Sequence, residues 1–251
     1  MSFKVTKRGR CKQLMELGPS TGMWSDAVLA TFLGNKARGW PEKFAKVDGV
    51  YFHWGEQVTH FVGFEALPNL KCILGASASL KSLDGLEHCK GLEVAFFPGS
   101  DHTTVTTLAP LAGLTKLAQL RLYKYTKLSN IDALATLSSL RALEFQYAEK
   151  VKSLAPIGKA KNLEALSLYG WDLSKLKLED LAPLSKLRYL DLTARGLRDI
   201  SALAELPKLE KVRVYNYKIP ELKGHEKLEG KLVDGYNGVE DFDDEVLSCD
   251  A

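Results

Sequence analysis

The feature that most constrains the fold is the stretch Leu108–Leu122 (LAPLAGLTKLAQLRL), where leucine recurs at two different spacings. Leucine occupies 108, 111, 114, 117 and 120 at steps of three, and Leu122 follows at a step of two. Steps of three fit a short 3-10-like segment with one apolar edge. A step of two fits a strand whose alternate side chains point the same way. The change of period within one stretch predicts one coil of a solenoid.

The same pattern recurs along the chain at intervals of 20 to 28 residues. Alignment on Leu120 gives a series of predicted strand residues, each followed two positions later by a small or apolar side chain. The series is Val50, Leu70, Leu92, Leu120, Leu143, Leu166, Leu190 and Val212. Because each coil can bury its leucines only against its neighbours, the repetition predicts one elongated domain.

Over residues 47–220 this pattern resembles the leucine-rich repeat, whose L-x-x-L-x-L core recurs with a period of about 20–29 residues. The three-residue leucine steps resemble most the internalin-like class of bacterial proteins. The resemblance implies an α/β solenoid, shaped as a horseshoe or arc, with a parallel concave sheet of about 8 strands and short helical or 3-10 convex segments. One position departs from the family: at Tyr125 and its equivalents no repeat carries the usual asparagine or cysteine. Aromatic side chains at that position are expected to pack over the strand ends instead.

The ends of the chain do not fit the repeat. Residues 1–46 are expected to form an N-terminal cap with a helix near 26–33, because Ser25 is a suitable N-cap and Gly34 a suitable C-terminal glycine. The repeats are assigned to 47–217, and a C-terminal cap with an acidic tail to 218–251. Two irregular connections, 98–107 and 172–177, fit either loops on the binding side or tolerated surface insertions.

The composition and the net charge of the chain disfavour several classes of function. The net charge of +3 is too slight to indicate nucleic-acid binding. The chain has no recognisable secretion signal and no apolar stretch long enough to span a bilayer, so a cytoplasmic location is expected. Cys72 and Cys89 occupy apolar places in the repeat and are expected to be buried. Pairing of Cys11 with Cys249 is left open.

Catalytic and metal motifs are weak. His53, Glu56 and His60 place a carboxylate between two histidines, but the spacing differs from that of a metalloprotease, and no metal site is predicted. The sequence contains no P-loop, dinucleotide fingerprint or nucleophile elbow. We therefore expect no catalytic residue and no cofactor.

The positions between the buried strand leucines should face away from the core. The residues assigned to the position of Arg121 include Lys71, Glu93 and Glu144, which would form a ladder of alternating charge on strands about 4.8 Å apart. Such a ladder supports the sheet through cross-strand pairs, each worth about 0.2–1 kcal/mol. It also leaves little net field, which disfavours a phosphate groove.

Ten of the 23 aromatic residues fall on three predicted outward rows. They are Trp54, Phe96, Phe97, Tyr123, Tyr125, Tyr147, Tyr169, Trp171, Tyr215 and Tyr217. Trp54 and Phe97 are expected to pack within the molecule or under a terminal cap. At about 100 Å² each, the ten would supply roughly 1,000 Å², comparable with one side of a protein–protein interface.

These features predict a non-catalytic protein–protein interaction module, such as an adaptor, an inhibitor or an immunity protein, with no membrane partner. The alternatives are a self-associating scaffold, a metal-dependent enzyme, and a glycan or nucleic-acid binder. The residues predicted to bind the partner are Tyr123, Tyr125, Tyr147, Tyr169, Trp171, Tyr215, Arg121, Glu144, Asp191 and Arg213.

Overall fold

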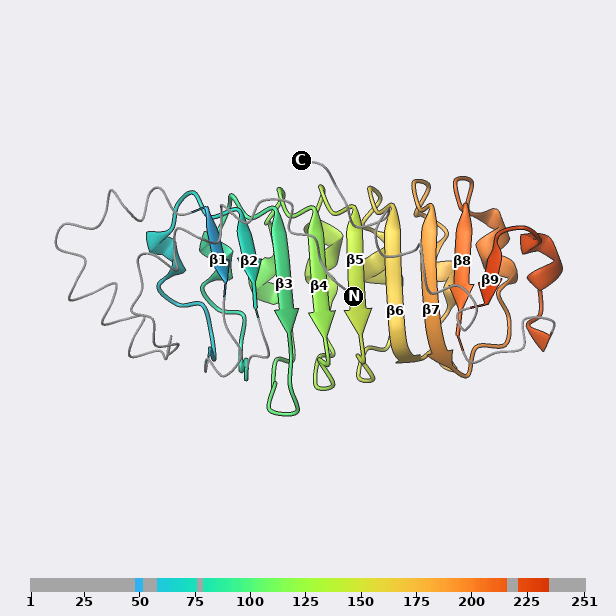
Figure 1. The fold of residues 1–251 in the computed structure, drawn as a ribbon, viewed down its shortest axis with the longest axis horizontal. Helices are drawn as coiled ribbons and strands as arrows, with labels where there is room; N and C mark the ends of the chain where they lie inside the picture. The colour runs from blue at the N-terminus through green and yellow to red at the C-terminus, as the bar shows by residue number, and fades with distance from the viewer. Residues whose placement is uncertain (1–47, 52–57, 76–78, 216–220, 235–251) are drawn as a thin grey trace.

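The computed structural model describes residues 48–51, 58–75, 79–215 and 221–234. Within them, nine strands form one parallel sheet in sequence order, standing side by side in Figure 1. The strands are β1 (Gly49–Tyr51), β2 (Cys72–Leu74), β3 (Val94–Pro98), β4 (Gln119–Tyr123), β5 (Ala142–Gln146), β6 (Ala165–Asp172), β7 (Tyr189–Arg195), β8 (Lys211–Val214) and β9 (Leu232–Asp234). This is the solenoid that the repeat predicts.

Short helical segments carry the chain from one strand to the next, and they lie behind the sheet in Figure 1. Most are 3-10 turns, as the three-residue leucine steps predict, and one is a short α-helix, α4 (Ala155–Gly158). The 3-10 segments are Phe64–Ala66, Leu86–His88, Ala109–Leu111, Asp132–Thr136, Leu178–Leu181, Ser201–Glu205 and His225–Leu228. No helix in the described ranges is long and apolar enough to cross a bilayer.

The leucines of the repeat form the core. Leu108, Leu111, Leu114, Leu117 and Leu120 are all fully buried, and so are their counterparts in the neighbouring coils. One continuous apolar cluster runs from Val50 to Leu228. The change of leucine spacing from three to two therefore marks the passage from the convex segment into the strand.

The strand register corrects the predicted alignment of the first coils. Ala95 pairs with Leu120, and Ile73 pairs with Ala95, so Leu70 and Leu92 take the place of Leu117. The predicted 28-residue step is therefore wrong, because Ala95 and Leu120 are 25 residues apart. Leucine spacing could not reveal this, since both candidate positions face the core and Ala95 is a poor apolar marker.

The same shift changes the predicted charge ladder. Leu74 and Phe96, not Lys71 and Glu93, stand in the row of Arg121. The ladder of Lys71, Glu93, Arg121 and Glu144 as one row is therefore wrong, although Lys71 and Glu93 pair with each other at 3.4 Å.

The sheet extends beyond residue 217. Strand β9 pairs in parallel with β8, and Leu222 and Leu228 are buried in the core. One more coil is therefore present than the roughly eight strands expected. The helix near 26–33, the rest of the N-terminal cap and the acidic tail lie outside the described residues, so the assignment of caps stays a prediction.

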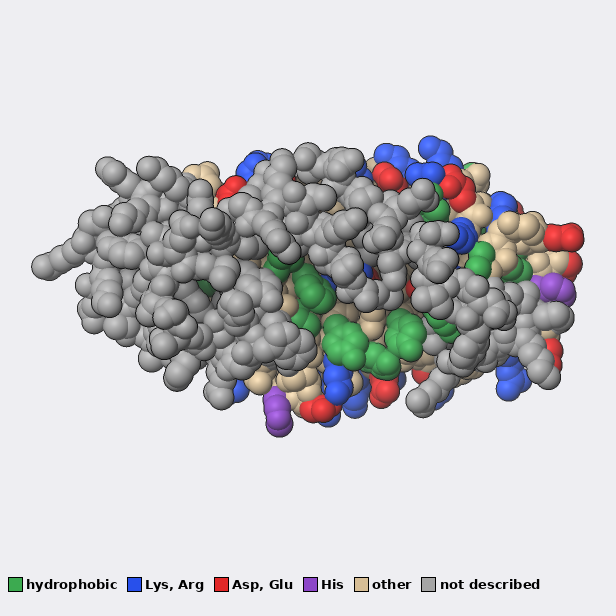
Figure 2. Space-filling model, in the orientation of Figure 1, with side chains coloured by type: hydrophobic (Ala, Val, Ile, Leu, Met, Phe, Trp, Pro, Cys, Tyr) green, Lys and Arg blue, Asp and Glu red, His purple; other side chains and the backbone are tan. Residues whose placement is uncertain are grey.

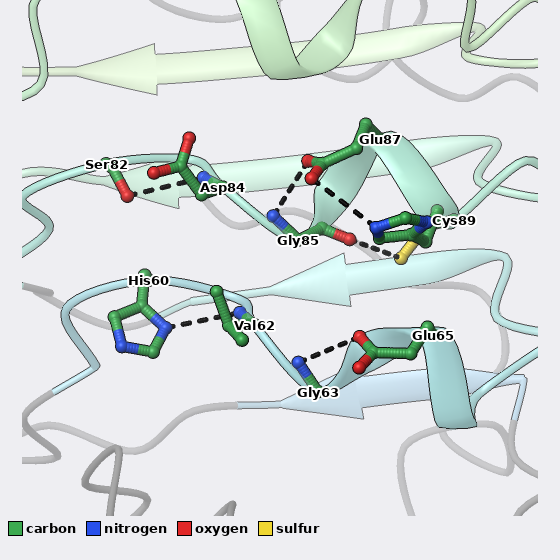
Figure 3. A network of polar contacts seen from close by, with 10 residues as sticks. His60, Val62, Gly63, Glu65, Ser82, Asp84, Gly85, Glu87 and Cys89 are labelled. Carbon is green, nitrogen blue, oxygen red and sulfur yellow. Dashed lines mark hydrogen bonds and ion pairs between the residues drawn. The ribbon is translucent and has the colours of Figure 1, made fainter.

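A polar side chain accepts a hydrogen bond from the backbone amide two residues further on, at or just before the start of most convex segments. His60 Nδ1 accepts a hydrogen bond from the Val62 amide at 3.2 Å, and Ser82 Oγ accepts one from the Asp84 amide at 3.4 Å (Figure 3). Thr107, Asn130, Ser153 and Asp199 repeat this bond at 2.9–3.1 Å. These local turn bonds satisfy amides that have no partner within the segment itself.

Cys72 and Cys89 are buried, as predicted from their apolar places in the repeat. Burial, reinforced by the nearby Glu87 and Glu65 carboxylates, raises the pKa of Cys89 to about 12. Both thiols therefore act as small core side chains. Cys11 and Cys249 lie outside the described residues.

The packing of the core yields a first prediction. Leu143→Ala removes a buried side chain from a central strand, so the free energy of unfolding should fall by about 2–5 kcal/mol. Leu176→Ala makes the same change where the leucine is only partly buried and should cost about 1 kcal/mol. Urea unfolding followed by circular dichroism measures both, and equal losses would contradict this assignment of the core.

Candidate protein-binding surface

Four tyrosines form one continuous row across the C-terminal ends of β4 to β8. The ring centroids of Tyr123 and Tyr147 are 5.8 Å apart, those of Tyr147 and Tyr169 5.5 Å, and those of Tyr169 and Tyr215 6.0 Å. Every pair is edge-to-face, the arrangement that aromatic quadrupoles favour. We call these four residues the tyrosine cluster.

The tyrosine cluster is accessible. Tyr123 is 40% exposed, and the other three rings are partly exposed. In Figure 2, hydrophobic side chains gather over the lower ends of the middle strands, with charged side chains along the edge beneath them. The structure thus brings together Tyr123, Tyr147, Tyr169 and Tyr215, four of the residues predicted to bind a partner.

An unusual backbone conformation shapes the cluster. Lys124 (φ 61°) and Tyr147 (φ 54°) occupy equivalent positions just after β4 and β5, and Gly170 (φ 76°) occupies the same position in β6. A non-glycine residue in this left-handed region is uncommon, and its conformation costs about 1–2 kcal/mol. The Tyr147 ring lies over Gly170, where an added Cβ would come within 2.5 Å of the ring.

Tyr125 and Trp171 do not belong to this surface. Both were predicted to face a partner, but Tyr125 is fully buried and Trp171 is 1% exposed, so that prediction is wrong. The reason is the left-handed residue before each of them, Lys124 or Gly170, which ends the strand alternation and turns the next side chain into the core.

The buried indole is anchored as a core group. Trp171 Nε1 donates a hydrogen bond to the Phe145 carbonyl at 2.7 Å, and the two rings pack edge-to-face at 5.0 Å. Burial raises the pKa of Tyr125. Phe97, expected to pack within the molecule, is also buried. Tyr125 and Trp171 occupy the position at which the sequence departs from the usual asparagine or cysteine of the family, and that departure is the one sequence feature that sets them apart from the outward rows.

Arg121 and Glu144 form a cross-strand ion pair on β4 and β5, with only 8% and 12% of their side chains exposed. The other Glu144 oxygen accepts a hydrogen bond from the Gln146 amide. The Arg121 guanidinium also lies 5.7 Å from the centre of the Phe96 ring. Both charges are therefore compensated within the sheet, and their contact with a partner stays a prediction.

Asp191 and Arg213 stand opposite each other on β7 and β8, and both are buried. Arg213 Nη1 donates a hydrogen bond to the Tyr215 hydroxyl at 3.1 Å, and its guanidinium lies 5.9 Å from the centre of that ring. Arg213 thus contacts the last ring of the tyrosine cluster, and the binding of a partner by Asp191 or Arg213 stays a prediction.

The insertion 98–107 borders the cluster. The Gly99 amide donates a hydrogen bond to the Tyr123 carbonyl at 2.7 Å, and Asp101 pairs with Lys124 at 2.7 Å. The hydrogen bond from Lys124 lowers the pKa of Asp101. In Figure 1 this loop projects below β3, at the same end of the sheet as the tyrosines. The insertion therefore lies beside the Tyr123 end of the tyrosine cluster.

The histidine motif considered as a metal site is only partly described. His53 and Glu56 lie outside the described residues, and His60 uses its Nδ1 to cap Val62. Within the part of the chain that the structure describes, no group of three His, Cys, Asp or Glu side chains could hold a metal ion.

Comparison with known proteins supports the fold. The sequence matches no protein-family model and no curated protein. The structure is similar to internalin C2 of Listeria monocytogenes, with a TM-score of 0.64 and 22% identity over 76% of this chain and 81% of that one. Internalin F of the same organism gives a TM-score of 0.53 and 23% identity, over 71% of this chain and 57% of the other. A leucine-rich-repeat protein of Leptospira interrogans gives 0.56 and 20%, over 68% and 44%.

These likenesses show the fold alone, because the identities are low. The buried repeat, the parallel sheet and the three structures agree on one class: the chain is a leucine-rich-repeat solenoid. Within that class its fold is the internalin-like form.

The contact between Tyr147 and Gly170 gives a second prediction. Gly170→Ala places a methyl group against the Tyr147 ring and should displace it, which changes the near-ultraviolet circular dichroism of the tyrosines. Gly230→Ala is the matched control, because its φ of 78° imposes the same backbone strain and nothing lies within 4 Å of the added Cβ.

The control should lose about 1–2 kcal/mol of unfolding free energy and keep the wild-type spectrum. Gly170→Ala should lose about 1–2 kcal/mol more, the order of cost of overpacking. Identical spectra and stabilities for the two variants would show that the ring is not seated on Gly170.

Proposed function

We propose that this chain is a non-catalytic protein-binding module whose partner docks on the tyrosine cluster. The observation that carries the proposal is the backbone of Tyr147, which is left-handed at a position where the next coil uses glycine. Strained backbone of this kind gathers at functional sites, and it is kept where the side chain does something that glycine cannot do.

Stability gives little reason to keep a tyrosine at this position. The left-handed conformation costs about 1–2 kcal/mol. The contacts of Tyr147 with two neighbouring rings return about 0.5–1.5 kcal/mol each. The two contacts, about 1–3 kcal/mol together, offset the strain without a large surplus, and we assign the benefit of Tyr147 over glycine to binding.

The chemistry of the surface favours a protein partner. Tyrosine supplies a large, rigid contact area with a polar tip, and it is enriched in binding hot spots. The charges beneath the cluster are compensated within the sheet, as the Arg121–Glu144 pair shows, so the row presents no strong positive field to a nucleic acid.

Within this proposal, the tyrosine cluster supplies the contact energy, and Arg121, Glu144, Asp191 and Arg213 set the register and orientation of the partner. An adaptor, inhibitor or immunity role in the cytoplasm of a bacterium belongs to the same proposal. Self-association through the cluster is the alternative, and sedimentation of the purified chain distinguishes it.

The test begins with a partner captured from the native host, identified and purified. Tyr147→Gly relieves the backbone strain, so the variant should be about as stable as the wild type. It should nevertheless bind the partner at least about tenfold more weakly, as expected for the loss of a hot-spot residue. Titration calorimetry measures the Kd, and urea unfolding measures the stability.

Tyr189→Ala is the control, because Tyr189 stacks on Arg188 at 4.9 Å and lies outside the cluster. Its Kd should stay within about twofold of the wild-type value. If Tyr147→Gly and the double variant Tyr123→Ala/Tyr169→Ala both bound like the wild type, the tyrosine cluster would not be the docking surface.

A further inference from the structure

A second charged row lies at the other ends of the strands. Its members immediately precede the strands and are joined by successive backbone hydrogen bonds. They are Lys71, Glu93, Ala118, Arg141, Glu164, Arg188 and Glu210. The charge alternates along the row except at Ala118, whose side chain is a single methyl group.

The charged residues at both ends of this row form ion pairs, whereas Ala118 in the middle of the row carries no charge. Lys71 pairs with Glu93 at 3.4 Å, and Arg188 binds Glu210 through two contacts of 2.7 and 2.9 Å. Arg141 is exposed and has no ion-pair partner among the residues that the structure describes. Ala118, beside it, leaves a gap where its neighbours in the row carry long charged side chains.

A groove of about 510 Å³ surrounds this gap. Three cations from different coils line it: Lys116, Arg141 and Lys186. Lys186 is held in place, because its Nζ donates a hydrogen bond to Asn162 Oδ1 at 2.6 Å. The Asn162 amide in turn donates to the Ser138 carbonyl at 2.6 Å.

The lining of the groove contains more basic than acidic side chains. Of its two carboxylates, Glu93 is already paired with Lys71, which leaves Glu164 opposite three cations. Such a balance suits a single carboxylate better than a polyanion, since Glu164 and Glu93 would repel a chain of phosphates. Arginine also offers two parallel N–H donors that match the two oxygens of a carboxylate.

We propose that this groove is a second binding site, which takes an Asp or Glu side chain of an acidic protein segment between Ala118 and Arg141. Arg141 and Lys116 contact the carboxylate, and Lys186 borders it. The site lies at the opposite ends of the strands from the tyrosine cluster and does not depend on it.

The probe is a fluorescein-labelled hexapeptide with a single glutamate among glycines, and its binding is measured by anisotropy at low ionic strength. Ala118→Glu supplies a carboxylate from the chain itself, which should occupy Arg141 and weaken peptide binding at least about fivefold. Ala118→Gln fills the gap to the same extent without charge, so it can only obstruct the ligand and should weaken binding clearly less than Ala118→Glu does. Binding by the wild type should weaken as salt is added.

Three further arms complete the test. Arg141→Glu should weaken binding as Ala118→Glu does, and Tyr123→Ala should leave it unchanged, which separates this proposal from the tyrosine cluster. A glutamine-containing peptide should not bind. Equal losses for Ala118→Glu and Ala118→Gln, equal binding of the glutamine peptide, or a tenfold preference for a phosphoserine peptide would each overturn the carboxylate assignment.

Discussion

The structure depends on one constraint: a single coil cannot bury its own leucines. Each leucine of the template from Leu108 to Leu122 reaches full burial only because the coils on either side cover it. Stacking then sets the strands in parallel register about 4.8 Å apart, so residues at equivalent positions form rows. Side chains at equivalent positions of successive coils therefore stand next to one another on the surface, and the identity of these side chains decides what the surface can bind.

The tyrosine cluster shows how a row becomes a surface. The register alone would place Gln146, not Tyr147, beside Tyr123. The left-handed backbone at Tyr147 brings its ring into the line, where it bridges the rings of Tyr123 and Tyr169. Gly170 makes this possible, because any larger residue would meet that ring. The surface thus arises from strain in one coil and an absent side chain in the next.

The fold was predictable from the leucine spacing. Few backbone conformations can bury a side chain that recurs at steps of three and then of two. The register of the first coils was not predictable, since Leu92 and Ala95 both face the core and the leucine appeared the better match. The predicted outward direction of Tyr125 and Trp171 failed for a different reason. Simple alternation ends at a left-handed residue, and Lys124 gives no sign in the sequence that it adopts that conformation.

Function in such a fold belongs to the side chains on its rows and cannot be taken from the fold itself. The central claim is that Tyr123, Tyr147, Tyr169 and Tyr215 together contact the partner. The most direct measurement is NMR of the chain with ring-labelled, assigned tyrosines, recorded before and after the purified partner is added. The account predicts that the four cluster rings shift while buried Tyr125 and off-cluster Tyr189 do not. A complex that forms with all four cluster resonances unchanged would contradict it.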